Sequence, residues 1–271
     1  RVGKVMLLPA GSNLAAAEES IELKRAHGCD SSLLSIDNVR ERFPELQHFP
    51  LPYAGALYAP GDEVGDARIF AHELTCWLEQ NRGLEWQGGV TVDELDVRRG
   101  VVRGVKSSAG DIAADAVLVC LGVESCKVLR PVGVAAPIYP LRGYSVTLPA
   151  GPATPSVSVT DMQRRIVFSK MNGHVRIAGL ADFVGDDHAR DASRIKSLLE
   201  TARAIAPDYA EYRAADSAPW AGDRPMTPNS RPLVGATKVA GLYLNCGHGM
   251  LGWTLAAATG KQAAAAITRG H

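Results

Sequence analysis

Three glycines near residue 250 have the spacing of a turn that can bind an electron-rich group. Gly247, Gly249 and Gly252 fit the pattern G-x-G-x-x-G, between an apolar strand predicted at 242–244 and an alanine-rich helix predicted to begin near Thr254. Such glycines let backbone N–H groups approach an anion closely at a helix N-terminus. The spacing alone is weak evidence, and the alternative is a turn whose glycines serve only close packing.

A complete dinucleotide-binding unit needs more than this turn. It requires a second strand and an acidic residue about 20 positions further on, which holds a ribose hydroxyl. No Asp or Glu follows Gly252, and the sequence continues for only 19 residues beyond it. We therefore expect no NAD site here. The turn is expected to offer N–H groups and a helix dipole to some other electron-rich group.

Arg224 is the second candidate for chemistry, in a segment at 224–232 that predicts a proline-punctuated loop. A guanidinium stays charged and offers two parallel N–H donors, which suits a carboxylate. The alternative is a salt bridge, for instance with the neighbouring Asp223. His248 stands between two glycines, so we expect it to shape the turn by hydrogen bonding rather than to transfer protons.

The composition excludes several classes of protein. The chain has 271 residues, of which 46% are hydrophobic, and its 29 basic and 29 acidic residues balance. A sizeable core is therefore expected. No segment is dense in Lys and Arg with interleaved aromatic residues, so we expect no nucleic-acid partner. Five scattered cysteines indicate reduced thiols in a cytoplasmic protein. No spacing of potential ligands indicates a metal site. No apolar run is long enough to span a membrane.

Hydrophobic periodicity and turn residues predict the elements that position these candidates. The predicted helices lie at 14–27, 35–43, 67–81 and 190–206. The predicted strands lie at 4–8, 84–86, 91–97, 101–107, 112–113, 144–148, 156–160, 166–170, 174–180 and 242–244. A continuous apolar run at 116–122 predicts one more strand, at the centre of a sheet that helices cover.

The order of these elements predicts a mixed fold of the α/β (α+β) class. Two interleaved domains explain it best. Residues 62–139 and 220–271 are expected to form a layered α/β domain, and residues 1–61 and 140–219 an antiparallel-sheet domain.

Two stretches carry a resemblance to a known family. Residues 220–228, which read WAGDRPMTP, and residues 242–254, which read LYLNCGHGMLGWT, resemble the C-terminal signature of bacterial D-amino acid dehydrogenases. These enzymes belong to the D-amino acid oxidase and glycine oxidase group of flavoproteins. The similarity extends over nearly all of the chain. The sequence departs from the family at three places. The family usually has Leu where this chain has Asp223, and Asp-Gly where this chain has Asn-Ser at 229–230. It often has Thr at the position of Cys246.

The resemblance implies FAD as cofactor. Residues 62–139 and 220–271 would then form an incomplete FAD-binding Rossmann-like domain, and residues 1–61 and 140–219 the antiparallel-sheet substrate domain. Arg224 would bind the substrate carboxylate, and Tyr144 and Tyr58 would bound the substrate pocket, although buried tyrosines are commonly core residues. The residues expected to contact FAD are Val92, Gly122, Gly247, His248, Gly249, Met250, Leu251, Gly252, Trp253 and Thr254.

The expected activity is oxidative deamination of a D-amino acid by hydride transfer from the α-carbon to flavin N5, with an electron acceptor other than oxygen. A glycine, sarcosine or D-hydroxyproline oxidoreductase is the nearest alternative. The family's N-terminal ADP-binding segment has no counterpart in this sequence, so a truncated chain, or a flavin-free subunit that needs a separate ADP-binding polypeptide, is a further alternative. The chain is expected in the cytoplasm, with association with the inner face of the membrane left open.

Overall fold

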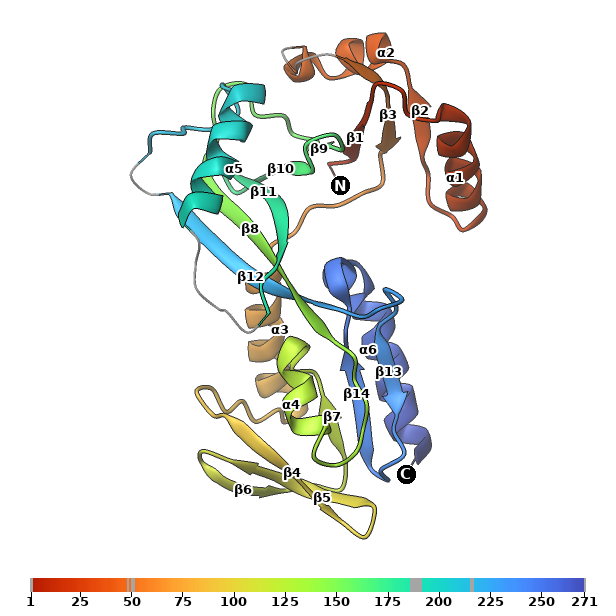
Figure 1. Cartoon of the computed structure of the whole chain (residues 1–271), viewed down its shortest axis with the longest axis vertical. Coiled ribbons are helices and arrows are strands. Elements are labelled where there is room, and N and C mark those ends of the chain that lie inside the picture. Colours follow the sequence, from red (N-terminus) through yellow and green to blue (C-terminus); the bar gives the residue numbers. More distant parts are fainter. Residues whose placement is uncertain (1, 48, 50–51, 186–191, 215–216, 271) are drawn as a thin grey trace. The chain divides into compact units, whose positions relative to one another are not determined.

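The computed structural model describes residues 2–47, 49, 52–185, 192–214 and 217–270, and the chain forms two compact units (Figure 1). Unit 1 comprises residues 1–66, 143–181 and 189–222, and unit 2 comprises residues 67–142, 182–188 and 223–271. These main boundaries lie within five residues of those expected from the sequence. The assignment of FAD to one unit and substrate to the other stays a prediction.

The large sheet has eight strands. Its spatial order is β12-β8-β11-β10-β9-β1-β3-β2. Along the chain the strands are β1 (Lys4–Pro9), β2 (Ser32–Leu34), β3 (Tyr53–Ala59), β8 (Tyr139–Pro149), β9 (Ser158–Asp161), β10 (Ile166–Met171), β11 (His174–Phe183) and β12 (Ala218–Met226). The sheet is mixed rather than purely antiparallel, because β1 pairs with β9 in parallel while β3 and β10 pair with their neighbours antiparallel.

In the described part of unit 1, three helices and one 3-10 turn accompany the strands. They are α1 (Leu14–Ala26), α2 (Ile36–Arg42), η1 (Pro44–Leu46) and α5 (Ala192–Ile205). Asn13 and Ser35 accept N–H groups at the starts of α1 and α2, as N-cap residues do. Phe49, Phe168 and Tyr209 pack edge to face or tilted in the core of the unit.

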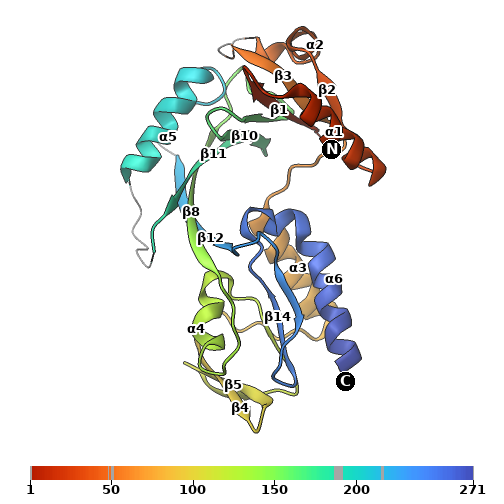
Figure 2. The same ribbon diagram turned by 45° about the vertical axis from the view of Figure 1, so that its right-hand side comes forward.

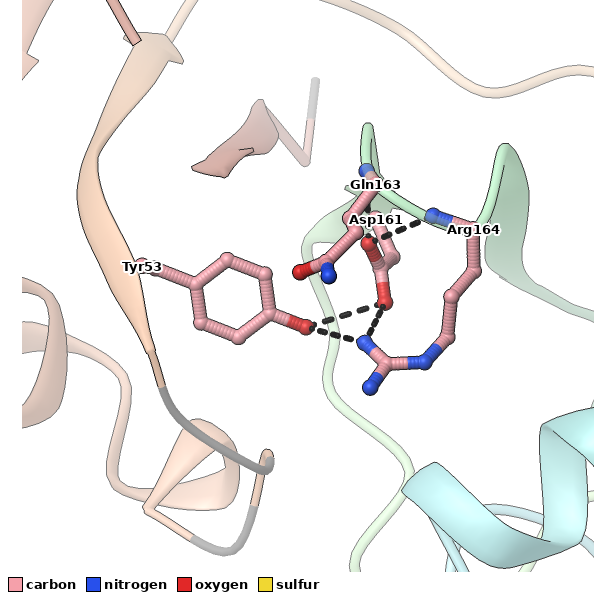
Figure 3. Close-up of polar contacts among 4 residues, drawn as sticks. All are labelled: Tyr53, Asp161, Gln163 and Arg164. Carbon is pink, nitrogen blue, oxygen red and sulfur yellow. Dashed lines mark hydrogen bonds and ion pairs between the residues drawn. The ribbon is translucent and has the colours of Figure 1, made fainter. Parts of the chain in front are cut away.

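A buried polar network joins β3 to the turn after β9 (Figure 3). Asp161 is fully buried, and its Oδ2 accepts a hydrogen bond from the Tyr53 hydroxyl at 2.9 Å and one from Arg164 Nη1 at 2.8 Å. Its Oδ1 accepts from the backbone N–H groups of Gln163 and Arg164. The carboxylate therefore fixes the β9–β10 turn and ties it to a strand more than 100 residues earlier.

Unit 2 contains two three-stranded sheets. The meander β4-β5-β6 consists of Val92–Arg98, Val101–Ser107 and Gly110–Ala113. The second sheet has the order β13-β14-β7, formed by Leu233–Ala236, Leu242–Cys246 and Val117–Val119. The other elements are α3 (Ala67–Arg82), η2 (Gly122–Glu124), α4 (Ser125–Leu129), η3 (Gly249–Leu251) and α6 (Gly252–Gly270). In both views α6 lies along β13 and β14 (Figures 1 and 2).

Several predicted elements differ in the structure. The apolar run at 116–122 forms only the short strand β7, which lies at the edge of its sheet because among the described residues only β14 pairs with it. Residues 84–86 form no strand. Residues 224–226 belong to β12 rather than to a loop, because β8 supplies a pairing partner. Pro225 is compatible with that strand since β12 is an edge strand, where one N–H can be absent.

Apolar side chains remain exposed on α3. No residue of this helix is buried, and Ile69, Phe70, Leu74 and Trp77 are each between 42% and 53% exposed. Leu118 of β7 and the nearby Leu121 are also exposed. Unit 2 thus carries apolar surface that the described residues leave uncovered. In the described part of the chain, no helix has both the length and the hydropathy needed to cross a bilayer.

Candidate functional site

The glycine turn connects β14 to α6 and requires its first two glycines. Gly247 and Gly249 have φ angles of 75° and 55°, in the region that side chains disfavour. A Cβ on Gly247 would lie 2.8 Å from Thr227 Cγ2, and one on Gly249 would lie 2.9 Å from Met226 Sδ. The turn is therefore packed tightly against the end of β12 and the residue that follows it, which are also part of unit 2.

The start of α6 presents backbone donors. No side chain caps η3, and neither η3 nor α6 has an acidic residue in its first turn. The first N–H groups of a helix lack intrahelical acceptors, and the dipole adds roughly half a positive charge there. Met250, Leu251, Trp253 and Thr254 are exposed, while the Trp253 ring packs edge to face on Phe70 of α3. An electron-rich group placed beside this turn would meet N–H donors and apolar side chains.

A buried acceptor lies at the entrance to the turn. Asn245 Oδ1 has no hydrogen-bond partner among the described residues. An unpaired buried polar atom costs about 1–3 kcal/mol, and Ser125 Oγ and Thr160 Oγ1 are unpaired among the described residues in the same way. The site thus has a polar group that its own side chains leave unsatisfied.

His248 is held by the helix that follows it. Its Nε2 lies 3.0 Å from the Thr259 hydroxyl, which in turn donates to the Leu255 carbonyl oxygen at 3.1 Å. Burial lowers the pKa of His248, which favours the neutral ring. The sequence led us to expect a hydrogen bond from His248 to the backbone, whereas its bond is to a side chain of α6. The role of His248 in shaping the turn stays a prediction.

Arg224 is a partly buried cation with no ion-pair or hydrogen-bond partner within the described residues. Burial lowers the pKa of its guanidinium, and no acid among the described residues offsets that cost. Asp223, the alternative partner considered from the sequence, is bound by Arg142 instead: Arg142 Nε and Nη2 donate to its two carboxylate oxygens at 2.8 and 2.9 Å. Adjacent residues of a strand point to opposite faces, so β12 separates these two charges.

The Arg142–Asp223 pair was not predicted from the sequence. The two side chains are only 4% and 11% exposed, so the pair is buried. The available signal was Asp223 itself, a charge where the family resemblance leads us to expect Leu. The sequence did not indicate which residue, 81 positions away, would neutralise it.

Both tyrosines predicted to bound a substrate pocket lie in the core of unit 1. Tyr144 is 3% exposed, with the Arg194 guanidinium 6.0 Å from its ring centre. Tyr58 lies beneath Arg42, whose guanidinium is 4.4 Å from the ring centre and 3.4 Å from the hydroxyl. Their substrate role stays a prediction.

Val92 and Gly122, the remaining predicted cofactor contacts, both belong to unit 2 but to different elements. Val92 is the first residue of β4, where it pairs with Ser107. Gly122 follows β7 with a φ angle of 57° and begins η2. The contact of Val92 and Gly122 with FAD stays a prediction. A pocket of about 350 Å³ lies on the meander among Asp96, Arg98, Arg103 and Asp111 and contains none of the predicted site residues. The described residues include no cluster of His, Cys, Asp and Glu suited to a metal ion.

Comparison with known proteins agrees with the resemblance seen in the sequence. The chain is 38% identical over 267 residues to "D-amino acid dehydrogenase 2" of Ralstonia nicotianae, covering 94% of this chain and 62% of that protein. It is 34% identical to "D-amino acid dehydrogenase 2" of Mesorhizobium japonicum, covering 87% of this chain and 56% of that protein. The chain therefore spans about 60% of the length of these relatives.

Solved structures share the fold. Glycine oxidase from Geobacillus kaustophilus superposes with a TM-score of 0.84 at 22% identity, over 98% of this chain and 70% of that one. L-proline dehydrogenase from P. horikoshii superposes with a TM-score of 0.86 at 18% identity, over 99% and 72%. The family model of the FAD dependent oxidoreductases (DAO) matches residues 1–266. The chain belongs to this family of FAD dependent oxidoreductases.

Proposed function

We propose that this chain supplies the substrate-binding and flavin-facing part of an enzyme that oxidises D-amino acids. The observation that carries the proposal is Arg224, a partly buried guanidinium without a partner among the described residues. A desolvated cation is costly unless an anion completes it. An α-amino acid carboxylate has the charge and the two parallel acceptor oxygens that a guanidinium binds. The names of the relatives support a D-amino acid as substrate.

The neighbouring ion pair supports this role of Arg224. Asp223 is the nearest acid in the sequence, and Arg142 already occupies both of its oxygens. Arg224 therefore keeps its full charge for a ligand instead of forming an internal pair. Pro225 restricts the backbone beside it and reduces the freedom that a bound substrate would have to remove.

The glycine turn fits one edge of a flavin ring. We expect the N–H groups of Gly249 to Trp253, the α6 dipole and the Thr254 hydroxyl to face the pyrimidine end, where negative charge collects on reduction. Bound FAD would supply the acceptor for the hydride that leaves the substrate α-carbon. Val92 and Gly122 would meet the cofactor elsewhere in unit 2, in keeping with the family resemblance.

The proposed reaction requires no proton-transferring side chain from this chain. A substrate that binds with a neutral amine can lose hydride from its α-carbon without a strong base, so no catalytic acid or base has to be assigned. The two tyrosines of unit 1, Tyr58 and Tyr144, would contribute shape to the substrate region rather than proton transfer.

The test compares D-alanine with D-alaninamide, which lacks the carboxylate charge. With FAD bound, anaerobic flavin reduction should prefer D-alanine in the wild type. Arg224→Ala should remove that preference at a cost of about 2–5 kcal/mol in kcat/KM for D-alanine, the usual penalty for truncating one member of a buried charge pair. Arg224→Lys should retain part of it, because the charge remains and the bidentate geometry is lost.

Arg231 provides the control, since it is an exposed arginine in the loop that follows β12. Arg231→Ala should reduce flavin with wild-type kinetics. An unchanged preference for D-alanine in Arg224→Ala would refute the carboxylate assignment, and equal rates with L-alanine would refute the proposed stereochemistry. Turnover with a redox dye but not with oxygen would support an electron acceptor other than oxygen.

The exposed apolar surface of unit 2 favours a second candidate, a subunit that binds flavin only together with another polypeptide. The exposed apolar side chains are Ile69, Phe70, Leu74 and Trp77 of α3 and Leu118 of β7. Among the described residues β7 has an open edge, and an open strand edge is a site where a further βα unit can add.

The two candidates differ in the cofactor that this chain binds alone. Under the first, the purified chain becomes yellow after incubation with FAD and retains the colour on gel filtration. Under the second, it stays colourless until it is co-expressed with the part of a longer relative that has no match here. Colour in neither preparation would reject both candidates.

A further inference from the structure

The hydrogen bonds around His248 determine which of its ring nitrogens carries the proton. Thr259 is buried in α6, and its hydroxyl lies 3.1 Å from the Leu255 carbonyl oxygen. A carbonyl oxygen can only accept, so the single hydroxyl proton of Thr259 is used in this bond. Toward His248 Nε2, at 3.0 Å, the hydroxyl oxygen is left as an acceptor.

It follows that His248 Nε2 is the donor. A neutral imidazole has one N–H and one bare nitrogen, so Nδ1 then carries a lone pair. No described residue forms a hydrogen bond with Nδ1. His248 Nδ1 is therefore a side-chain acceptor at the turn that no described residue uses.

We propose that Thr259 is a positioning residue, which fixes His248 in the Nε2–H tautomer so that Nδ1 accepts a hydrogen bond from the imide N–H of a bound isoalloxazine ring. This inference rests on the proposed function, because it assumes that the turn faces a flavin. It gives a role to the hydrogen bond between the side chains of His248 and Thr259, which are 11 residues apart.

The chemistry of the ring edge matches this arrangement. The pyrimidine end of an isoalloxazine presents one N–H, at N3, between two carbonyl oxygens. The carbonyl oxygens require donors, which the N–H groups of the turn and of the first turn of α6 provide. The N–H requires an acceptor, and a bare imidazole nitrogen is a good one.

The tautomer can be measured in the chain without any flavin. Long-range proton–nitrogen spectra of 15N-histidine protein, with His248 assigned by its loss in His248→Gln, should show a pyrrole-type Nε2 and a pyridine-type Nδ1. Thr259→Val should move both nitrogen shifts toward each other, because the ring regains exchange between tautomers. Thr259→Ser should restore the wild-type spectrum.

Thr268 is the matched control. It lies in the same helix and makes the same bond to the carbonyl four residues earlier, from its hydroxyl to Ala264 at 3.1 Å. Thr268→Val should leave both His248 nitrogen shifts unchanged. A pyrrole-type Nδ1 in the wild type would overturn the proposal, and so would a Thr259→Val spectrum identical to that of the wild type.

The ligand is tested with FAD and 3-methyl-FAD, in which a methyl group replaces the N3 proton. By equilibrium dialysis, wild-type protein should bind 3-methyl-FAD at least about tenfold more weakly than FAD, a difference of about 1.4 kcal/mol. In His248→Ala this ratio should fall toward one, since the acceptor is gone. An unchanged ratio in His248→Ala would overturn the assignment of the imide N–H.

Failure of the proposed function gives a different result. If neither flavin binds the wild type, the flavin reading of the turn is refuted together with the ligand assigned to Nδ1. The nitrogen shifts then still decide whether Thr259 fixes the tautomer, because they are measured on the protein alone.

Discussion

Replacing Asp223 by leucine would remove the carboxylate that accepts hydrogen bonds from Nε and Nη2 of the buried Arg142 guanidinium. The side chains are 4% and 11% exposed, with donor–acceptor distances of 2.8 and 2.9 Å. Removing one partner of a buried pair typically costs about 3–5 kcal/mol, because a buried charge then loses the opposite charge beside it. We expect Asp223→Leu to lower the free energy of unfolding of unit 2 by that amount.

The double variant separates the ion pair from the burial of its members. Arg142→Met combined with Asp223→Leu removes both charges and keeps apolar volume, so its stability should lie within about 1 kcal/mol of the wild type or exceed it. The coupling energy from the four proteins is then about 3 kcal/mol or more. Urea unfolding, followed by a probe confined to unit 2 such as Trp253 fluorescence in Trp-to-Phe backgrounds, would measure it.

The meander contains a control with the same bidentate geometry at the surface. Arg98 donates to both oxygens of Asp96 at 3.1 and 2.9 Å, but the arginine side chain is 74% exposed. Asp96→Leu should therefore cost only a small fraction of what Asp223→Leu costs, because water solvates the arginine that is left. Equal losses in the two variants, or a coupling energy below about 1 kcal/mol for Arg142 and Asp223, would refute the reasoning from burial.

Two further predictions concern single groups. Asp161→Asn should destabilise unit 1 by about 1.5–3 kcal/mol, because it weakens the charge-assisted hydrogen bonds from Tyr53 and Arg164. Tyr53→Phe removes only one hydrogen bond to Asp161 and should cost about 1 kcal/mol. Equal losses of the two variants in urea unfolding would contradict this order. Because burial lowers the pKa of His248, the unfolded chain takes up that proton first as the pH falls. The contribution of His248 to stability is thus complete above about pH 6.5 and is lost below it. The wild type should lose more stability between pH 7.5 and 5.5 than His248→Gln, and parallel pH profiles would contradict this.

Local patterns in the sequence were sufficient for most elements. Helical periodicity at 67–81 corresponds to α3 (Ala67–Arg82), and alternation at 101–107 and 174–180 corresponds to β5 and the first part of β11. Such patterns succeed because periods of 3.6 and 2 are properties of the segment itself. The glycine spacing at 247–252 likewise predicted the turn, since a positive φ angle is a local requirement that glycine meets.

Pairing between distant segments was decided only by the tertiary structure. Arg224 lies in a strand because β8 is there to pair with β12, and proline-rich residues with no partner would be read as a loop. The apolar run at 116–122 predicts a central strand, yet β7 lies at an edge because strand position depends on neighbours rather than on its own residues. The Arg142–Asp223 ion pair joins residues 81 positions apart, and the hydrogen bond between His248 and Thr259 joins residues 11 apart. Arg224 has no partner among the described residues. Sequence alone determined which groups could do the chemistry. The fold determined which of them are left free to do it, because a charge or a lone pair is available only when no neighbour has already bound it.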